Sequence, residues 1–202
     1  YLLHERGKAM QNAEPVGKGS MIAVLGIKIF EIQDLLKNIN KKNNGVCEIA
    51  NDNADGQIIV SGNKEDINLL QILLKEKKIK SIPLKVSAPF HCSLMKPAAN
   101  IMENKINITK FKDPTFKIVN NVTAKPEDKS QSIKKLLTQQ IFSTVKWRES
   151  IIYMSEKGVK NFIEIGPGKA LSGMVKRTIK DVNCFSINTI ADIQNFVDEF
   201  KK

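Results

Sequence analysis

Apolar residues recur at two different periods within residues 21–86, and each period predicts a type of element. Short apolar runs typical of strands occupy residues 21–26, 46–50, 57–61 and 79–86. Between these runs, residues 30–39 and 63–77 carry apolar side chains at helical spacing. The resulting order, β-α-β-β-α-β, is the ferredoxin-like pattern.

The remainder of the chain alternates longer helical stretches with short strands. Helices are expected at residues 2–12, 94–106, 132–142, 147–157, 169–179 and 190–200, and strands at 116–119, 161–165 and 184–187. Alternating strands and helices imply a parallel sheet. We therefore predict an α/β fold in which a ferredoxin-like small domain, residues 15–91, is inserted into a large α/β domain formed by residues 1–14 and 92–202.

The composition is that of an ordinary globular protein, with 42% hydrophobic and 26% charged residues in a chain of 202. No apolar run approaches the roughly 18 residues of a membrane span, so no membrane partner is expected. The three cysteines are an odd number without a CxxC pair, which argues against a disulfide framework and a structural zinc site. A cytoplasmic location is the simplest interpretation.

The net charge of +11 comes almost entirely from lysine. Arginine suits the bidentate readout of nucleic acid better than lysine does, so no nucleic-acid partner is expected. The ferredoxin-like order also occurs in RNA-recognition domains, but these stack bases on aromatic residues of a central strand, and residues 57–61 contain none. Two explanations of the charge stay open: a lysine-rich source composition, or attraction to an acidic partner.

Residues 87–98, Ser-Ala-Pro-Phe-His-Cys-Ser-Leu-Met-Lys-Pro-Ala, lie between a predicted strand and a predicted helix. Pro89 restricts Ala88 to extended conformations, which favours a turn, and Ser93 is placed to cap the helix. His91 then stands at a strand-to-helix corner, where α/β proteins place their chemistry, and it can exchange a proton near neutral pH. The alternative is a partly buried histidine near a helix start.

Two other motifs are weaker indications of function. Residues 93–96 match S-x-x-K, but the S-D-N and K-T-G motifs that accompany it in serine enzymes are absent from the sequence. Residues 166–168, Gly-Pro-Gly, precede a helix but lack the third glycine of a dinucleotide fingerprint and the G-K-[ST] of a phosphate loop. No spacing of His, Cys and carboxylates suggests a metal.

The segment 87–98 resembles the catalytic-histidine segment of malonyl-CoA:acyl carrier protein transacylases of the bacterial fatty-acid synthesis type. Three further stretches agree in the same order along the chain. Residues 5–11 resemble the substrate-arginine helix of this family, residues 139–147 its glutamine segment, and residues 164–171 its C-terminal strand, loop and helix. The resemblance covers nearly the whole chain.

The resemblance implies ping-pong transfer of malonyl from malonyl-CoA to the phosphopantetheine thiol of acyl carrier protein, through a serine acyl-enzyme. It makes His91 the base and Gln140 the group that orients it, through the backbone carbonyl. It makes Arg6 the partner of the malonyl carboxylate, and places Phe90 where related acyltransferases discriminate malonyl from branched extender units. No cofactor is expected, since the substrates carry coenzyme A and phosphopantetheine, and a monomer is expected.

One departure from the family is large. The acylated serine of the family lies in Gly-His-Ser-Leu-Gly, expected upstream of Arg6, and no G-x-S-x-G occurs in this sequence. We therefore expect the C-terminal portion of the enzyme, inactive by itself, with an incomplete parallel-sheet, α/β-hydrolase-like domain around the ferredoxin-like one. The alternative is a non-catalytic module that binds the carrier protein, or a degenerate homologue.

Overall fold

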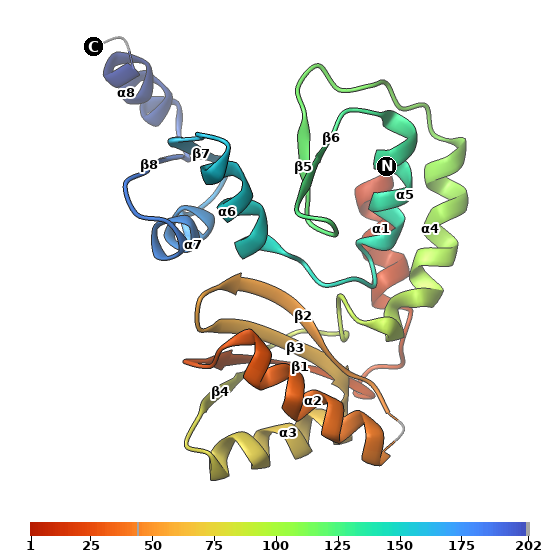
Figure 1. The fold of residues 1–202 in the computed structure, drawn as a ribbon. Coiled ribbons are helices and arrows are strands. Elements are labelled where there is room, and N and C mark those ends of the chain that lie inside the picture. The colour runs from red at the N-terminus through yellow and green to blue at the C-terminus, as the bar shows by residue number, and fades with distance from the viewer. Residues whose placement is uncertain (44, 201–202) are drawn as a thin grey trace.

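The computed structural model describes residues 1–43 and 45–200 (Figure 1). In chain order, its elements are α1 (Leu2–Gln11), β1 (Gly19–Leu25), α2 (Ile29–Asn43), β2 (Cys47–Ala54), β3 (Gln57–Asn63), α3 (Lys64–Glu76), β4 (Lys80–Pro83), the 3-10 helix η1 (Ser93–Met95), α4 (Lys96–Ile108), β5 (Ile118–Asn120), β6 (Lys125–Glu127), α5 (Ser130–Gln139), α6 (Trp147–Glu156), β7 (Asn161–Ile165), α7 (Ala170–Thr178), β8 (Asn183–Ile187) and α8 (Ile190–Phe200).

The first sheet has the order β2-β3-β1-β4, and every neighbouring pair in it is antiparallel. Helices α2 and α3 lie together on one face of this sheet (Figure 1). This is the ferredoxin-like arrangement that the spacing of apolar residues predicts. Strand β4 is shorter than the predicted run 79–86: it ends at Pro83, and the amide of the next residue, Leu84, makes one more bond to β1, to the carbonyl of Met21 at 2.9 Å.

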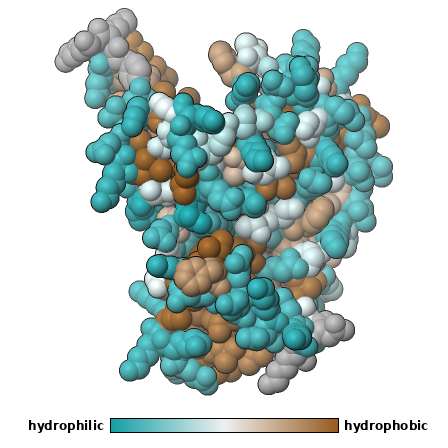
Figure 2. All heavy atoms as spheres, viewed as in Figure 1, coloured by the Kyte–Doolittle hydropathy of each residue, from teal (hydrophilic) through white to brown (hydrophobic). Residues whose placement is uncertain are grey.

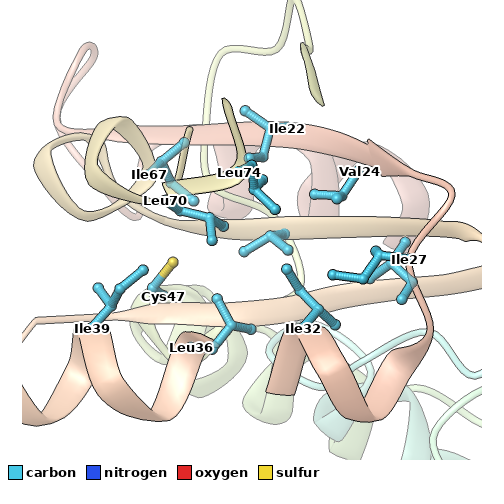
Figure 3. Close-up of a cluster of buried hydrophobic side chains, with 12 residues drawn as sticks. Ile22, Val24, Ile27, Ile32, Leu36, Ile39, Cys47, Ile67, Leu70 and Leu74 are labelled. Carbon is cyan, nitrogen blue, oxygen red and sulfur yellow. The ribbon is translucent and has the colours of Figure 1, made fainter. Parts of the chain in front are cut away.

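Both faces of this sheet are buried. The face under the helices is filled by one apolar cluster, shown in part in Figure 3: Ile22, Val24, Ile27, Ile32, Leu36, Ile39, Cys47, Ile58, Val60, Ile67, Leu70 and Leu74. Because side chains alternate along a strand, Met21 and Ala23 point to the opposite face, where they cluster with Ala50 and Ile59. Phe90 packs against this second cluster. The sheet thus supports the segment that carries His91.

The remaining strands form two separate pairs. Strands β7 and β8 are parallel, as the alternation of strands and helices predicts. Strands β5 and β6 instead form an antiparallel hairpin, because the few residues between them are too short for a crossover connection. The polar residues 125–130 predict a loop, and this prediction is wrong for Lys125–Glu127, which form β6 with Pro126 in its interior.

Helices α1, α4 and α5 pack together beside the hairpin (Figure 1). Their shared core is built mostly from alanine and methionine, with two isoleucines: Ala9, Met10, Ala88, Met95, Ala98, Ala99, Met102, Ile106 and Ile141. An ion pair of 2.8 Å between Lys105 and Glu5 joins α4 to α1. Among the helices that the structure describes, none combines the length and apolar composition needed to cross a membrane.

The molecule has two parts: the four-stranded sheet with α2 and α3, and the remaining helices and strands. The segment between α5 and α6 connects them. It runs along the outer edge of β2 (Figure 1), where Val145 donates to the carbonyl of Ala50 at 2.8 Å and accepts from the amide of Asp52 at 3.0 Å. A free strand edge exposes unpaired backbone groups, and this segment covers part of that edge. The small sheet is therefore joined by backbone hydrogen bonds to the segment that follows Gln140.

Candidate active site

His91 lies in the loop between β4 and η1 and has a φ angle of 59°. A left-handed conformation is uncommon for a residue with a side chain and costs on the order of 1 kcal/mol or more. The loop is held by local contacts: the amide of Phe90 donates to the carbonyl of Ala88 at 3.1 Å, and Cys92 Sγ donates to the carbonyl of Pro89 at 3.1 Å. Strained residues that their surroundings hold in place cluster at functional sites.

The imidazole of His91 is oriented by Gln140, which follows the last residue of α5. Its Nδ1 lies 3.0 Å from the backbone carbonyl oxygen of Gln140. A carbonyl oxygen can only accept, so Nδ1 carries the proton and the Nε2 lone pair is left available. The neutral ring is therefore presented as a base.

Three influences act on the proton affinity of His91. Burial lowers its pKa from the ordinary value, the hydrogen bond to Gln140 raises it, and the positive charge of Arg6 lowers it further. Burial is the largest of the three, and the net pKa is below that of a free histidine. The ring is thus mostly neutral at pH 7.

Arg6 lies on α1 and is half-buried. Burial lowers the pKa of its guanidinium, which stays charged at physiological pH. Among residues 1–43 and 45–200, the structure shows no ion pair or hydrogen bond for this guanidinium. A half-buried cation without an acidic partner is suited to binding the carboxylate of a ligand.

Phe90 is also half-buried, and it contacts both the core of α1, α4 and α5 and the second face of the small sheet. Its ring is therefore held between the two parts of the molecule, next to His91 in the sequence. Its predicted part in substrate selection stays a prediction.

The prediction that Ser93 caps the following helix with its own hydroxyl is wrong. Ser93 is the first residue of η1, and its amide donates to Glu48 Oε2 at 2.8 Å while its hydroxyl donates to Glu48 Oε1 at 2.7 Å. The carboxylate of Glu48, on β2, satisfies the free amide at this helix start and opposes the positive end of the helix.

Cys92 does not form a dyad with His91. Its side chain is fully buried, and its thiol lies 3.6 Å from Ser61 Oγ and donates to a backbone carbonyl. Burial raises the pKa of the Cys92 thiol to about 11. A thiol with so high a pKa is not a nucleophile at neutral pH.

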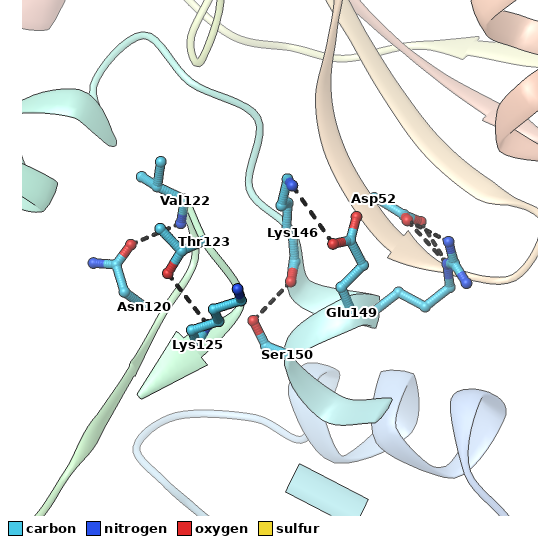
Figure 4. Close-up of polar contacts among 9 residues, drawn as sticks. Asp52, Asn120, Val122, Thr123, Lys125, Lys146, Glu149 and Ser150 are labelled. Atoms are coloured by element: carbon cyan, nitrogen blue, oxygen red, sulfur yellow. Dashed lines mark hydrogen bonds and ion pairs between the residues drawn. The ribbon is translucent and has the colours of Figure 1, made fainter. Parts of the chain in front are cut away.

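The side chain of Gln140 is held as well as its carbonyl. Its Nε2 donates to Asn121 Oδ1 at 3.1 Å, and the backbone carbonyl of Asn121 accepts from the amide of Lys146 at 2.9 Å. The preceding Asn120 fixes this turn, since its Oδ1 accepts from the amide of Val122 at 2.7 Å (Figure 4). No local pattern of the sequence predicts a role for Glu48, and the signal for Asn121 is a pair of asparagines, residues 120 and 121, that follows a predicted strand.

A buried ion pair anchors α6 on β2. Asp52 is 1% exposed, and its two carboxylate oxygens accept from Arg148 Nε at 3.0 and 2.9 Å (Figure 4). Arg148 Nη2 lies 2.8 Å from Asp52 Oδ2. The fork of the guanidinium matches the carboxylate, and this contact raises the pKa of Arg148.

The structure relates three of the four predicted site residues to one another. The carbonyl of Gln140 orients His91, and the positive charge of Arg6 lowers the pKa of His91. Such a set can accept a proton and bind an anion. In the part of the chain that the structure describes, no three His, Cys, Asp or Glu side chains are placed to hold a metal ion.

No protein-family model matches this sequence. Curated proteins match it over nearly its whole length. It is 36% identical over 200 residues to the malonyl CoA-acyl carrier protein transacylase of Haemophilus influenzae, covering 98% of the chain and 63% of that protein. It is 36% identical over 203 residues to the protein of the same name from Bacillus subtilis, covering 100% of the chain and 64% of that protein.

Solved structures that resemble this chain carry the same kind of name as these curated proteins. The malonyl CoA-acyl carrier protein transacylase of Clostridium perfringens superposes with a TM-score of 0.93 at 34% identity, over 99% of this chain and 63% of that one. A malonyl-transacylase solved in complex with its type II PKS acyl-carrier protein gives a TM-score of 0.93 at 33% identity, over 98% of this chain and 64% of that one. These comparisons confirm the resemblance and the α/β fold. The chain spans slightly under two thirds of the length of these relatives.

Proposed function

We propose that this chain, a relative of the malonyl CoA-acyl carrier protein transacylases over nearly its whole length, is part of an enzyme that transfers malonyl from malonyl-CoA to the phosphopantetheine thiol of acyl carrier protein in fatty-acid synthesis. One observation carries the proposal. His91 presents an available Nε2, because Nδ1 is bound to the carbonyl of Gln140, and the half-buried Arg6, whose charge lowers the pKa of His91, has no acidic partner among the described residues.

The reaction also needs a nucleophile. The 202 residues contain no G-x-S-x-G, so we place the serine in a segment outside them and call that segment together with this chain the complete enzyme. The shorter span of the chain relative to its relatives supports this placement.

In the first half of the reaction, His91 Nε2 takes the proton of the serine hydroxyl as its oxygen attacks the thioester carbonyl of malonyl-CoA. The carbon–sulfur bond breaks, and the coenzyme A thiolate receives the proton from His91. In the second half, Nε2 takes the proton of the carrier thiol, its sulfur attacks the malonyl ester, and the serine oxygen recovers the proton. The carbonyl of Gln140 holds Nδ1–H throughout and stabilises the charged ring between transfers.

Arg6 binds the malonyl carboxylate in this proposal, since a planar guanidinium accommodates both carboxylate oxygens. Phe90, fixed between two apolar clusters, limits the room beside the acyl group and disfavours branched substrates. We further propose that the complete enzyme acts in the cytoplasm as a monomer, without a cofactor.

The test is a transfer assay with the complete enzyme, malonyl-CoA and carrier protein bearing phosphopantetheine, with malonyl-carrier measured by mass spectrometry. We expect transfer, and a loss of about 10²–10⁴-fold in His91→Ala, the usual range for a positioned acid–base group. Carrier binding without thioester exchange would overturn the proposal and favour a non-catalytic binding module.

A further inference from the structure

We propose that Glu48 and Asn121 are positioning residues for the contact between His91 and Gln140, with Glu48 holding the histidine loop and Asn121 holding the glutamine. The inference rests on the proposed function, because it gives these residues a part in the same reaction. Their side-chain hydrogen bonds among the described residues go to Ser93 and to Gln140, so each acts on the imidazole through a neighbour.

Glu48 fixes the chain two residues after His91. Its carboxylate accepts both the amide and the hydroxyl of Ser93, at 2.8 and 2.7 Å, across 45 positions of sequence. His91 itself adopts a left-handed backbone conformation, which persists only where the surrounding structure determines it. The contact with Glu48 is a long-range restraint on the downstream end of this loop.

Asn121 fixes the other side of the contact. Its Oδ1 accepts the side-chain amide of Gln140 at 3.1 Å, and its backbone carbonyl accepts the amide of Lys146 at 2.9 Å. The residue that supplies the accepting carbonyl is therefore tied by its side chain to the turn after β5. Gln140 follows the last residue of α5, and its amide still donates to the carbonyl of Leu136 at 2.9 Å, so the contact with Asn121 adds a side-chain restraint to this backbone bond.

The two sides meet on one strand. Next to Glu48 on β2, the carbonyl of Ile49 accepts from Thr144 Oγ1 at 2.6 Å, and the carbonyl of Ala50 accepts from the amide of Val145 at 2.8 Å. Strand β2 thus holds both the histidine loop and the segment after Gln140. A hydrogen bond weakens steeply with distance and angle, so a shift of about 1 Å on either side would release the imidazole.

The experiment compares Glu48→Ala, Asn121→Ala and the double variant in the complete enzyme. We expect kcat for malonyl transfer to fall by about tenfold to 100-fold in each single variant, with KM for malonyl-CoA little changed. We expect the double variant to lose less than the product of the two single losses, because both act on one contact. Glu48→Gln and Asn121→Asp each keep an acceptor oxygen and should recover part of the rate.

Matched controls exist in the C-terminal part of the chain. Glu164 accepts the amide and hydroxyl of Ser172 at 2.7 Å each, as Glu48 does with Ser93. Asn161 Oδ1 accepts from Asn183 Nδ2 at 2.9 Å, as Asn121 does from Gln140. We expect Glu164→Ala and Asn161→Ala to keep the wild-type kcat. Thermal unfolding of every variant, followed by circular dichroism, accompanies the kinetics.

The pH profile of kcat/KM separates positioning from general loss of stability. The hydrogen bond to Gln140 raises the pKa of His91, against burial and the charge of Arg6, which both lower it. Releasing that bond lets the pKa fall, so the acid limb of the profile should move to lower pH in Glu48→Ala and Asn121→Ala. A merely less stable enzyme would keep the midpoint of the wild type.

The outcomes are distinct. If the wild type transfers malonyl and His91→Ala does not, while Glu48→Ala and Asn121→Ala match their controls in kcat and pH midpoint, the positioning inference is overturned and the proposed function stands. A loss of kcat that follows thermal stability, with an unmoved acid limb, overturns it equally. A wild type without transfer overturns the proposed function, and the inference with it.

Discussion

At the scale of single residues, the proton affinity of His91 is set by opposing influences. Desolvation disfavours the charged ring, and the carbonyl of Gln140 stabilises it by accepting from Nδ1–H. Desolvation is the larger influence, so the folded protein keeps this histidine neutral at pH values where a free one is already protonated. A base has to be neutral to accept a proton, and burial therefore serves the proposed reaction.

This balance predicts the acid limb of kcat/KM. The neutral fraction of His91 falls only when the pH drops through its lowered pKa, so activity should persist on the acid side of the ordinary value of 6.5. The midpoint is measured with malonyl-CoA from pH 4.5 to 8, after a check that the enzyme stays folded throughout. A midpoint above 6.5 would show that the positive contribution of the hydrogen bond outweighs burial.

Arg6 predicts a difference between two substrates. In Arg6→Ala the malonyl carboxylate loses its partner, while an acetyl group has no carboxylate to bind. We expect malonyl transfer to fall by about 10-fold to 1000-fold, on the order of 1.5–4 kcal/mol for a charged partner, and acetyl transfer to change little. Rates with malonyl-CoA and acetyl-CoA are measured side by side.

Arg177→Ala is the matched control, because that arginine is exposed and donates a hydrogen bond of 2.9 Å to Gln57 Oε1. We expect it to leave both rates unchanged. Equal losses for malonyl and acetyl in Arg6→Ala would mean that Arg6 supports the fold and does not read the carboxylate.

The sequence could identify some of these residues and not others. His91, Gln140 and Arg6 stand in segments that resemble a known family, so the sequence alone is enough to propose their part in the site. Glu48 and Asn121 meet their partners across 45 and 19 positions of sequence. Contacts of this kind depend on how elements pack, and no local pattern of residues reports them.

At the scale of elements, strand β2 is the one that joins the two parts of the molecule. Besides its backbone bonds to the segment at Val145, it carries Asp52, whose buried carboxylate is bound by Arg148 at the start of α6. Removing one partner of a buried ion pair leaves the other charge uncompensated. This lowers the free energy of unfolding by more than an exposed ion pair contributes to it.

Arg148→Ala should therefore lower the free energy of unfolding by about 3 kcal/mol, since Asp52 is left 1% exposed without its cation. Urea unfolding of the complete enzyme measures the change. Adding Asp52→Asn to Arg148→Ala should recover part of the loss, because the buried charge is then gone.

Lys37→Ala is the control for this comparison, since Lys37 and Asp34 form an ion pair of 3.5 Å on the surface. We expect its effect to stay within about 0.5 kcal/mol. A similar small effect for Arg148→Ala would show that water compensates Asp52 and that the pair does not anchor α6.

The sequence predicted most of the elements for physical reasons. Apolar periodicity located α3, for example, because its face toward the sheet is fully buried at Ile67, Leu70 and Leu74. It missed β6, which is short, polar and interrupted by Pro126. It also missed the backbone pairing at Val145, because the segment gains one bridge to a strand edge and carries no strand pattern of its own.

At the scale of the whole molecule, some large apolar side chains stay exposed, both around the four-stranded sheet and outside it. Ile165 on β7 is 80% exposed and Phe116 before β5 is 82% exposed. Brown side chains reach the surface over the unit of β7 and α7 as well as over the small domain (Figure 2). Strand β7 pairs with β8, and β5 pairs with β6, in sheets that are separate among the described residues.

This surface and the absence of an elbow serine from the sequence lead to the last prediction. Acylation needs a serine on a strained turn beside an oxyanion hole, and the 202 residues contain no G-x-S-x-G. Two serines at helix starts already donate their hydroxyls to carboxylates: Ser93 donates to Glu48, and Ser172 donates to Glu164. The 202-residue chain alone should therefore form no malonyl adduct.

The measurement is intact mass spectrometry after incubation of this chain with malonyl-CoA, with the complete enzyme as the positive control. The complete enzyme should gain the mass of one malonyl group and the 202-residue chain none. Because exposed apolar surface favours association, the chain is first shown to be folded by circular dichroism and size-exclusion chromatography. A stoichiometric adduct on the short chain would place the nucleophile within these residues, and mapping the modified serine would then identify it.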